Sequence, residues 1–194
     1  MLAPTDFHWA AVKRILRYLK ETASYGFHIT RGTSFALHGF TDVDWVGSID
    51  DRKSMSGYLV FFGQTPISWK SGKQHTVARS STEAKYKALA DGTAEVIWLQ
   101  YLLTDLQVPS ISAPTIWCDN LGAIYLSANP IFHARTKHVE VDYHFVRDRV
   151  AKKEIQIRFI RSRDQLANVF TKPLSAASFT AFRFKLWVDP PPSA

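Results

Sequence analysis

SFALHGFTDVDWVGSIDDRKSMSGYLVFFGQTPISWK, residues 34–70, contains three apolar runs that are rich in aromatic and β-branched side chains. The first two, 34–45 and 54–63, flank the polar turn SIDDRK, and the third, 66–70, follows GQT. Runs of this kind that are joined by short polar turns pair as antiparallel strands. The stretch therefore predicts a meander of three strands, which begins a sheet.

A long helical pattern follows this meander. Ser80, Ser81 and Thr82 are N-cap candidates, and one stripe recurs at steps of three and four residues. A lysine on a stripe that faces a sheet is expected to meet an acidic partner, because an unpaired buried charge is costly. The stripe consists of Lys85, Leu89, Gly92, Val96, Leu99, Leu103 and Leu106.

The rest of the chain completes an α/β pattern. A short strand is predicted at 115–118, helices at 121–127 and 139–153, a strand at 155–160, and a helix at 165–170 with Asp164 as its N-cap. The order β-β-β-α-β-α-α-β-α predicts a mixed five-stranded sheet flanked by helices. We expect three parts: an N-terminal basic helix and linker (1–33), the α/β domain (34–174) and a C-terminal extension that frays at its end (175–194).

The composition is that of an ordinary globular domain. The chain has 194 residues, 46% hydrophobic and 21% charged, with a formal charge of +7 and a pI near 9.6. The positive charge favours anionic partners, nucleic acid first. The single cysteine, Cys118, excludes an internal disulfide and indicates a reducing compartment. With neither a secretory signal nor a membrane-spanning run, we expect an intracellular protein, cytoplasmic or nuclear.

The N-terminal segment FHWAAVKRILRYLK (7–20) predicts a basic amphipathic helix. Such a helix packs its apolar face on the neighbouring domain or, as a minor alternative, acts as a mitochondrial import signal. The residues leave both roles open. The apolar face consists of Trp9, Val12, Leu16 and Leu19, and the charges off it are Lys13, Arg14, Arg17 and Lys20.

Two aspartates come directly after the apolar runs of predicted strands. Asp42 follows the apolar run of the first strand, and Asp119 follows TIWC in the fourth. Aspartates in such places are often turn or cap residues. If the two strands are neighbours, the carboxylates converge and form the nucleus of a Mg²⁺ site. Asp44, on the same strand face as Asp42, is either an auxiliary ligand or a surface or capping residue.

Long, ordered segments along nearly the whole chain carry a family resemblance. They are TDFHWAAVKRILRYLK, GFTDVDW, SIDDRKSMSGYLVFFGQTPISWKSGKQHTVARSSTEAKYKALA, IWCDNLGAI, RTKHVEVDYHFVRDRV and DQLANVFTKPL. With them, the sequence resembles the C-terminal end of a Ty1/copia-type retrotransposon polyprotein. The N-terminal helix resembles the last helical part of the reverse transcriptase and the rest resembles the ribonuclease H domain, which implies the RNase H-like fold.

The resemblance implies a reaction and a set of site residues. In the ribonuclease H family, two Mg²⁺ ions held by four acids cleave the RNA strand of an RNA–DNA hybrid. Here the first and third acids are Asp42 and Asp119. The family's second acid, in TEAEYxAL, is replaced by Lys85, and its fourth, in DQLADxFTKPL, by Asn168.

Neighbouring acids do not replace the lost ones. Glu83 lies about 200° around the helix from Lys85 and is expected to pair with Lys87, while Asp164 is expected to cap a helix. We expect Lys85 to pair with Asp42 or Asp119 and take the space of a metal ion. Mg²⁺ is then bound weakly or not at all, and the domain is a pseudo-enzyme, inactive or severely impaired.

Loss of cleavage need not abolish binding, and two basic clusters are candidates for nucleic-acid contacts, with a solvated loop as the alternative for each. The first consists of Trp69, Lys70, Lys73 and Arg79, and the second of Arg135, Lys137 and His138. Candidate partners are an RNA–DNA hybrid or other nucleic acid, or a host protein that has recruited the domain; an active Mg²⁺-dependent hybrid endonuclease is the alternative function. The methionine ahead of a mid-polyprotein segment favours a recruited or truncated product.

Overall fold

The computed structural model describes residues 3–27, 29, 34–48, 50–108, 112–128 and 140–190. Its centre is a five-stranded sheet in the order β4-β3-β2-β5-β6. The meander pairs antiparallel, β2 with β3 and β3 with β4, whereas β5 runs parallel to both β2 and β6. The strands are β2 (Leu37–Asp44), β3 (Met55–Phe62), β4 (Thr65–Lys73), β5 (Thr115–Cys118) and β6 (Gln156–Phe159). The predicted mixed sheet is confirmed.

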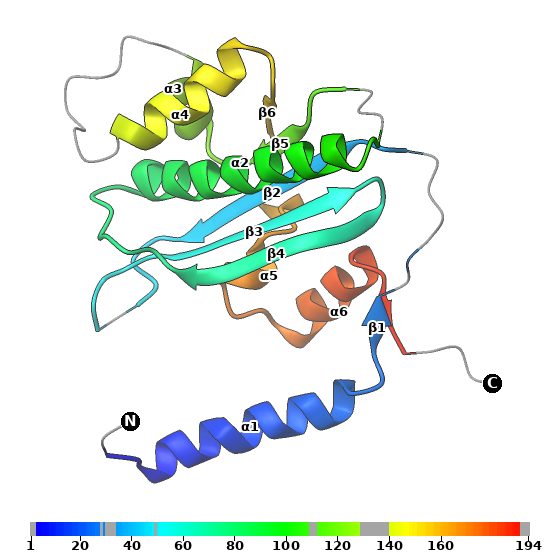
Figure 1. Ribbon diagram of the computed structural model, residues 1–194. Helices are drawn as coiled ribbons and strands as arrows, with labels where there is room; N and C mark the ends of the chain where they lie inside the picture. Colours follow the sequence, from blue (N-terminus) through cyan, green and yellow to red (C-terminus); the bar gives the residue numbers. More distant parts are fainter. Residues whose placement is uncertain are drawn as a thin grey trace.

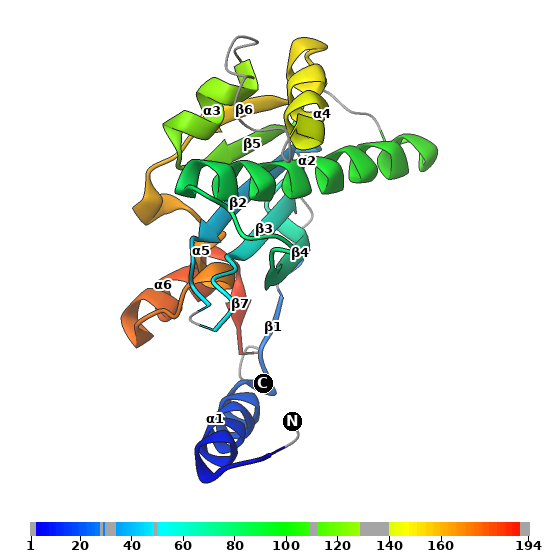
Figure 2. The same ribbon diagram turned by 90° about the vertical axis from the view of Figure 1, so that its left-hand side faces the viewer.

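Helices cover both faces of this sheet (Figures 1 and 2). The long helix α2 (Ser81–Asp105), with α3 (Leu121–Ala128) and α4 (Glu140–Ala151), lies on one face. The short helix α5 (Asn168–Thr171) packs on β2, β3 and β4 from the other face, and α6 (Ala176–Lys185) follows it on that side. The predicted order of elements is therefore present.

The main core lies between α2 and the sheet. Leu89, Val96 and Ile116 are fully buried there, because the apolar stripe of α2 faces the strands as predicted; its last member, Leu106, is exposed beyond the end of the helix. Gly92 allows the close approach of α2 to β2, since a Cβ atom at this position would lie 2.4 Å from Cγ2 of Thr41. This packing fixes the direction of the first turns of α2 over the end of β2.

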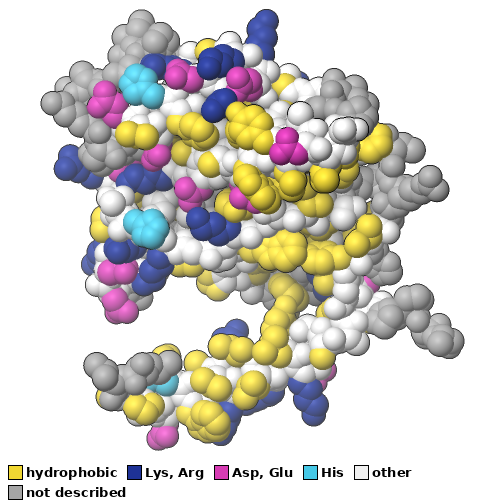
Figure 3. All heavy atoms as spheres, viewed as in Figure 1, with side chains coloured by type: hydrophobic (Ala, Val, Ile, Leu, Met, Phe, Trp, Pro, Cys, Tyr) yellow, Lys and Arg dark blue, Asp and Glu magenta, His cyan; other side chains and the backbone are white. Residues whose placement is uncertain are grey.

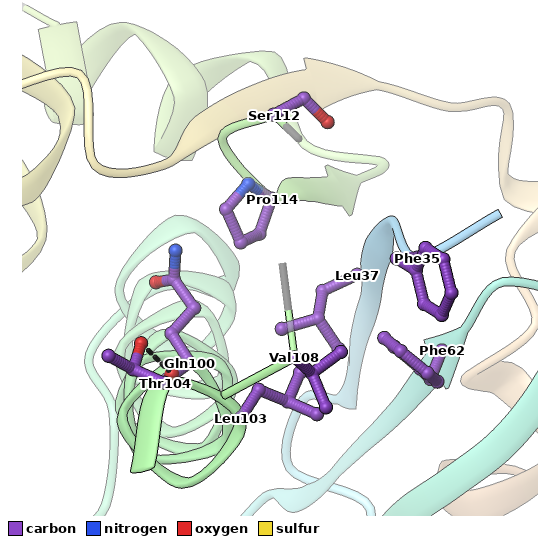
Figure 4. Close-up of a pocket in the computed structure, with 9 residues that line it drawn as sticks. All are labelled: Phe35, Leu37, Phe62, Gln100, Leu103, Thr104, Val108, Ser112 and Pro114. Carbon is purple, nitrogen blue, oxygen red and sulfur yellow. Dashed lines mark hydrogen bonds between the residues drawn. The ribbon is translucent and has the colours of Figure 1, made fainter. Parts of the chain in front are cut away.

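A small cavity lies at the other end of α2 (Figure 4). Its volume is about 50 Å³, which is close to the room that one or two water molecules occupy. Leu37, the first residue of β2, and Leu103, near the end of α2, are among the side chains around it. The cavity is therefore too small for a substrate and lies away from the strand end that carries Asp42.

The N-terminal helix α1 (Asp6–Thr22) extends away from the domain (Figure 1). Its described residues include no buried side chain, and its hydrophobic side chains are visible at the surface in Figure 3. Among the described ring contacts, one joins this helix to the domain: the ring centroids of Tyr18, near the end of α1, and Phe179 of α6 lie 5.9 Å apart. No described helix is both long and apolar enough to cross a membrane.

A two-stranded ribbon joins the N-terminal and C-terminal parts of the chain. Strand β1 (Gly26–Phe27) pairs antiparallel with β7 (Val188–Asp189). The residues expected to form a linker and those expected to form a separate C-terminal extension are thus hydrogen-bonded to each other. The three predicted parts and their boundaries stay a prediction.

The predicted helix at 165–170 with Asp164 as its N-cap is wrong. Ser162–Asp164 form a single 3₁₀ turn, and α5 begins only at Asn168. Gln165 interrupts the predicted helix, because its backbone is extended and its side chain is fully buried. Its amide nitrogen donates to the backbone carbonyl of Trp117 in β5 (3.2 Å). This contact with a distant strand overrides the local helical preference.

Candidate ion-paired centre

Strands β2 and β5 and helix α2 bring the candidate site together toward the carboxyl ends of the two strands. Because β2 and β5 are parallel neighbours and Thr41 is in register with Cys118, the next residues, Asp42 and Asp119, lie side by side. The cap formed by the Ser80 hydroxyl, which accepts from the backbone N–H of Glu83 (3.1 Å), starts α2 just before Lys85. The predicted meeting of Lys85 with the aspartates is therefore present.

Lys85 bridges the two carboxylates. Its Nζ atom donates to Oδ1 of Asp42 and to Oδ1 of Asp119, the second contact at 2.5 Å. The side chain of Asp42 is fully buried, that of Asp119 is 3% exposed, and that of Lys85 is 12% exposed. The three groups form a buried Asp–Lys–Asp triad, which we call the ion-paired centre.

The other carboxylate oxygens also have partners. Oδ2 of Asp42 accepts from the Thr171 hydroxyl and lies 3.2 Å from Nζ of Lys172. Oδ2 of Asp119 accepts from the Ser162 hydroxyl. All four oxygens of the two aspartates are thus engaged by donors of the protein itself.

Asn168 lies beside this centre and does not contact either aspartate among the described hydrogen bonds. Its Nδ2 atom donates to the carbonyl of Ser162 (2.7 Å), and its Oδ1 atom accepts from Lys172 (3.1 Å). The amide therefore holds two residues that in turn touch the aspartates. Its side-chain oxygen accepts a hydrogen bond from the Lys172 ammonium group, just as the carboxylate oxygens accept from donors of the protein.

The charges of the centre stabilise one another. Burial alone raises the pKa of Asp42, but the Lys85 ammonium and the Thr171 hydroxyl outweigh it and hold the pKa below its ordinary value. Burial alone lowers the pKa of Lys85, but Asp42 and Asp119 raise it above its ordinary value. The ionised form of each partner is favoured, which is the expected behaviour of a satisfied ion pair.

The side chains present do not fit a magnesium site. Mg²⁺ needs carboxylate oxygens that are free to coordinate it, whereas those of Asp42 and Asp119 accept hydrogen bonds from the protein. Two carboxylates face two ammonium groups, Lys85 and Lys172, so the formal charge of the set is zero. Among the described residues, no group of three or more His, Cys, Asp and Glu side chains is arranged to hold a metal ion.

The neighbouring acids lie where they do not replace the lost ligands. Glu83 pairs with Lys87 at 2.9 Å, as predicted, and accepts from the backbone N–H of Arg79. Asp164 lies in the 3₁₀ turn, 3.5 Å from Arg163. The carboxylate of Asp44, at the end of β2, lies against the following turn, where a Cβ atom at Gly47 would be 2.3 Å from its Oδ2 atom. These contacts are those of capping and surface residues.

The side chains of the first predicted nucleic-acid cluster do not share one surface. Lys70 and Lys73 border a groove of about 430 Å³, which we call the cationic groove; it is also lined by Lys87 and by two acids, Asp91 and Asp142. Trp69 is the neighbour of Lys70 in the strand, so its side chain leaves the opposite face, where it meets Phe27 at 5.4 Å. Arg79 is exposed and does not line the groove. The second cluster, Arg135, Lys137 and His138, lies outside the described residues.

Sequence reasoning missed three residues of the centre: Ser162, Thr171 and Lys172. The last two belong to the FTKPL segment, which carried part of the family resemblance, so their presence near the site had a signal. Ser162 had none, because a serine in a polar loop is unremarkable in sequence. In the family's pattern DQLADxFTKPL, the lysine that corresponds to Lys172 occurs together with an aspartate at position 168. Lys85 therefore distinguishes this centre from the four-acid pattern, and Lys172 does not.

The chain is similar over its full length to plant retrotransposon proteins. It is 46% identical over 194 residues, 100% of this chain, to the retrovirus-related Pol polyprotein from transposon RE2 of Arabidopsis thaliana. It is 39% identical over 180 residues, 91% of this chain, to the retrovirus-related Pol polyprotein from transposon TNT 1-94 of Nicotiana tabacum. The chain belongs to the Ty1/copia-type retrotransposon Pol family.

This copia-type Pol region spans 13% of the length of each of these two relatives. No protein-family model matches the chain. Its structure is similar to the solved N-terminal RNase H domain of rv2228c from Mycobacterium tuberculosis, a fusion with maltose-binding protein, with a TM-score of 0.52 and 11% identity. The match covers 76% of this chain and 99% of the other. The fold of the copia-type Pol region is therefore RNase H-like, as predicted.

Proposed function

We propose that this copia-type Pol region is an RNase H-like pseudo-enzyme, inactive or severely impaired in cleavage, that binds nucleic acid. The observation that carries the proposal is the position of Lys85, which bridges Asp42 and Asp119. In the family's four-acid pattern a glutamate occupies this position and a metal ion joins the acids. Here a fixed ammonium group joins them.

Electrostatics support the loss of metal binding. A divalent ion about 4 Å from an ammonium group is repelled by about 8 kcal/mol at an effective dielectric constant of about 20. The acids that remain cannot offset this repulsion, because Lys85 and Lys172 already neutralise them. Mg²⁺ affinity is therefore expected to be very low, and with it the ability to activate a water molecule at neutral pH.

The cationic groove supports a binding role. Phosphate contacts need positive charge and hydrogen-bond donors but no metal. Lys70 and Lys73 are about half exposed, and their present partners, Asp91 at 3.6 Å and Asp51 at 3.3 Å, form exposed ion pairs. Such pairs are weak, so a phosphate backbone can displace them at small cost. The formal charge of +7 favours the approach of the anion.

A cleavage assay with matched variants tests this proposal. The unaltered protein and Lys85→Glu/Asn168→Asp are incubated with an RNA–DNA hybrid, end-labelled on the RNA, in Mg²⁺ and in Mn²⁺. We expect the unaltered protein to bind the hybrid without cutting it and the double variant to regain cleavage. Adding Asp42→Asn to the double variant should abolish the regained activity. Lys152→Glu, the same charge change at an exposed site beyond α4, should restore nothing.

Each alternative function has its own result in this assay. Robust cleavage by the unaltered protein refutes the pseudo-enzyme and supports the active hybrid endonuclease. Absence of hybrid binding at physiological salt, measured by fluorescence anisotropy, refutes the nucleic-acid role and favours contacts with a host protein. Binding by the unaltered protein together with cleavage by the double variant is the outcome that supports the proposal.

A further inference from the structure

A second cleft lies on the sheet face that α2 does not cover. Its volume is about 510 Å³, and it is a shallow hollow that is wide open to solvent. Gly39 and Thr41 face α2, so the alternating residues of β2 point to the other face. The side chains that define this aromatic cleft are His38, Phe40, Phe61, Trp117, Lys185 and Trp187.

Aromatic rings that pack on one another form the surface of the aromatic cleft. Phe40 of β2 and Trp117 of β5 are partners in the parallel register, and their rings lie 6.4 Å apart with only 21° between their planes. Phe61 of β3 meets Phe40 edge-on at 5.8 Å. Phe40 and Trp117 are stacked on each other and only partly buried, so a planar ligand can extend this stack of rings where it is exposed.

Positive charge borders this aromatic surface. Lys185, at the end of α6, lines the cleft. Arg158 of β6 is exposed and is the register partner of Trp117, so it leaves the same face of the sheet. Burial lowers the pKa of His38 below its ordinary value, which leaves a neutral imidazole at the cleft. A planar group that carries negative charge matches this arrangement.

The backbone at Trp187 supplies the rim of the cleft. Its φ angle is 55°, a left-handed conformation that is uncommon for a bulky residue and that glycine usually occupies after a helix. The conformation ends α6, with the N–H of Trp187 donating to the carbonyl of Phe184 (3.1 Å). The indole is 47% exposed at the edge of the aromatic cleft. Here a position suited to glycine carries the largest aromatic side chain.

We propose that the aromatic cleft binds single-stranded nucleic acid, with bases stacked on its aromatic side chains, including the exposed Trp187 at its rim, and the adjacent phosphate near Lys185 and Arg158. Stacking on aromatic side chains accepts any base, because every base has a π face, and the phosphate contacts add sequence-independent attraction. Base-paired nucleic acid does not fit this surface, since its bases are already stacked. The site is separate from the ion-paired centre and from the cationic groove.

Binding is measured by anisotropy of a labelled single-stranded DNA of about 12 nucleotides, a length typical of single-strand sites. We expect Trp187→Gly to weaken this binding about tenfold, the loss expected when one aromatic contact to a base is removed. Glycine is well suited to the left-handed backbone at this position, so the variant is expected to fold. Arg158→Ala, at an exposed site, should lower the slope of log K against log salt by about 0.7, the value of one phosphate contact.

A matched control and a second ligand make the test decisive. Trp98→Ala removes a tryptophan of similar exposure, 56%, from the α2 face and should not change single-strand binding. Hybrid binding by Trp187→Gly should also be unchanged, which separates this proposal from the proposed function. The proposal is overturned if Trp187→Gly binds the single strand normally or if the unaltered protein does not bind it. It is also overturned if adenosine monophosphate binds as tightly as the oligonucleotide, because the occupant is then a free nucleotide.

Discussion

Replacement of Lys85 by methionine is the sharpest test of the ion-paired centre. Methionine keeps most of the aliphatic volume of lysine and removes the ammonium group. The change leaves Asp42 and Asp119, which are 0% and 3% exposed, beside each other without the group that bridges them. Removal of one partner from a buried ion pair costs about 3–5 kcal/mol, because the remaining charge stays buried.

The surrounding contacts place the expected loss near the lower end of that range. At 2.5 Å, the gross attraction between Lys85 and Asp119 is about 7 kcal/mol at an effective dielectric constant of about 20, before desolvation is subtracted. Asp42 keeps Lys172 at 3.2 Å and the Thr171 hydroxyl. We therefore expect Lys85→Met to lower the free energy of unfolding by about 3 kcal/mol at neutral pH.

The loss should depend on pH in a defined direction. In the unaltered protein the pKa of Asp42 lies below its ordinary value, so its contribution to stability is full above the unfolded pKa of about 3.9 and is lost as the pH falls through the folded pKa. In Lys85→Met, burial and the second carboxylate raise the pKa of Asp42. Its protonation then relieves the penalty in mild acid, so the two proteins should differ less near pH 4.5 than near pH 7.

Urea unfolding followed by tryptophan fluorescence, at both pH values, measures these differences. Lys70→Met is the matched control, because Lys70 pairs with Asp91 at 3.6 Å and both side chains are more than half exposed. That exposed pair is expected to contribute about 0–1 kcal/mol. If Lys85→Met loses no more stability than Lys70→Met, or if its deficit grows in acid, the reasoning about a buried, charged triad is refuted.

Two further predictions concern the packing around the centre. Gly92→Ala should lower the free energy of unfolding by about 1–3 kcal/mol, because its Cβ atom would lie 2.4 Å from Cγ2 of Thr41; Gly72→Ala, which meets nothing within 4 Å, is the control, and equal melting temperatures for the two variants would contradict the close approach of α2. Burial raises the pKa of the fully buried Cys118 thiol to about 11, so Ellman's reagent near pH 8 should react with it only after denaturation; rapid reaction in the folded protein would show that β5 is accessible.

Much of the site could be predicted because its signals are local. The apolar runs before Asp42 and Asp119 and the stripe that contains Lys85 are patterns within a few neighbouring residues. The family resemblance then identified position 168 as the place of the family's fourth metal-binding acid. Local pattern failed at Asp164 and Gln165, where the burial of Gln165 against Trp117 of β5 replaces a helical turn. No local signal could show that contact.

The sequence by itself determined that a lysine stands on the buried stripe of α2 and that an aspartate follows the apolar run of each of two strands. Only the tertiary structure decided which oxygens meet which donors. Lys85 and Asp42 are 43 positions apart, and Thr171 and Asp42 are 129 apart. Contacts over such separations depend on strand order, on the register of β2 with β5, and on the close approach at Gly92. Periodicity within one element carries no information about these, because they arise when the elements pack together.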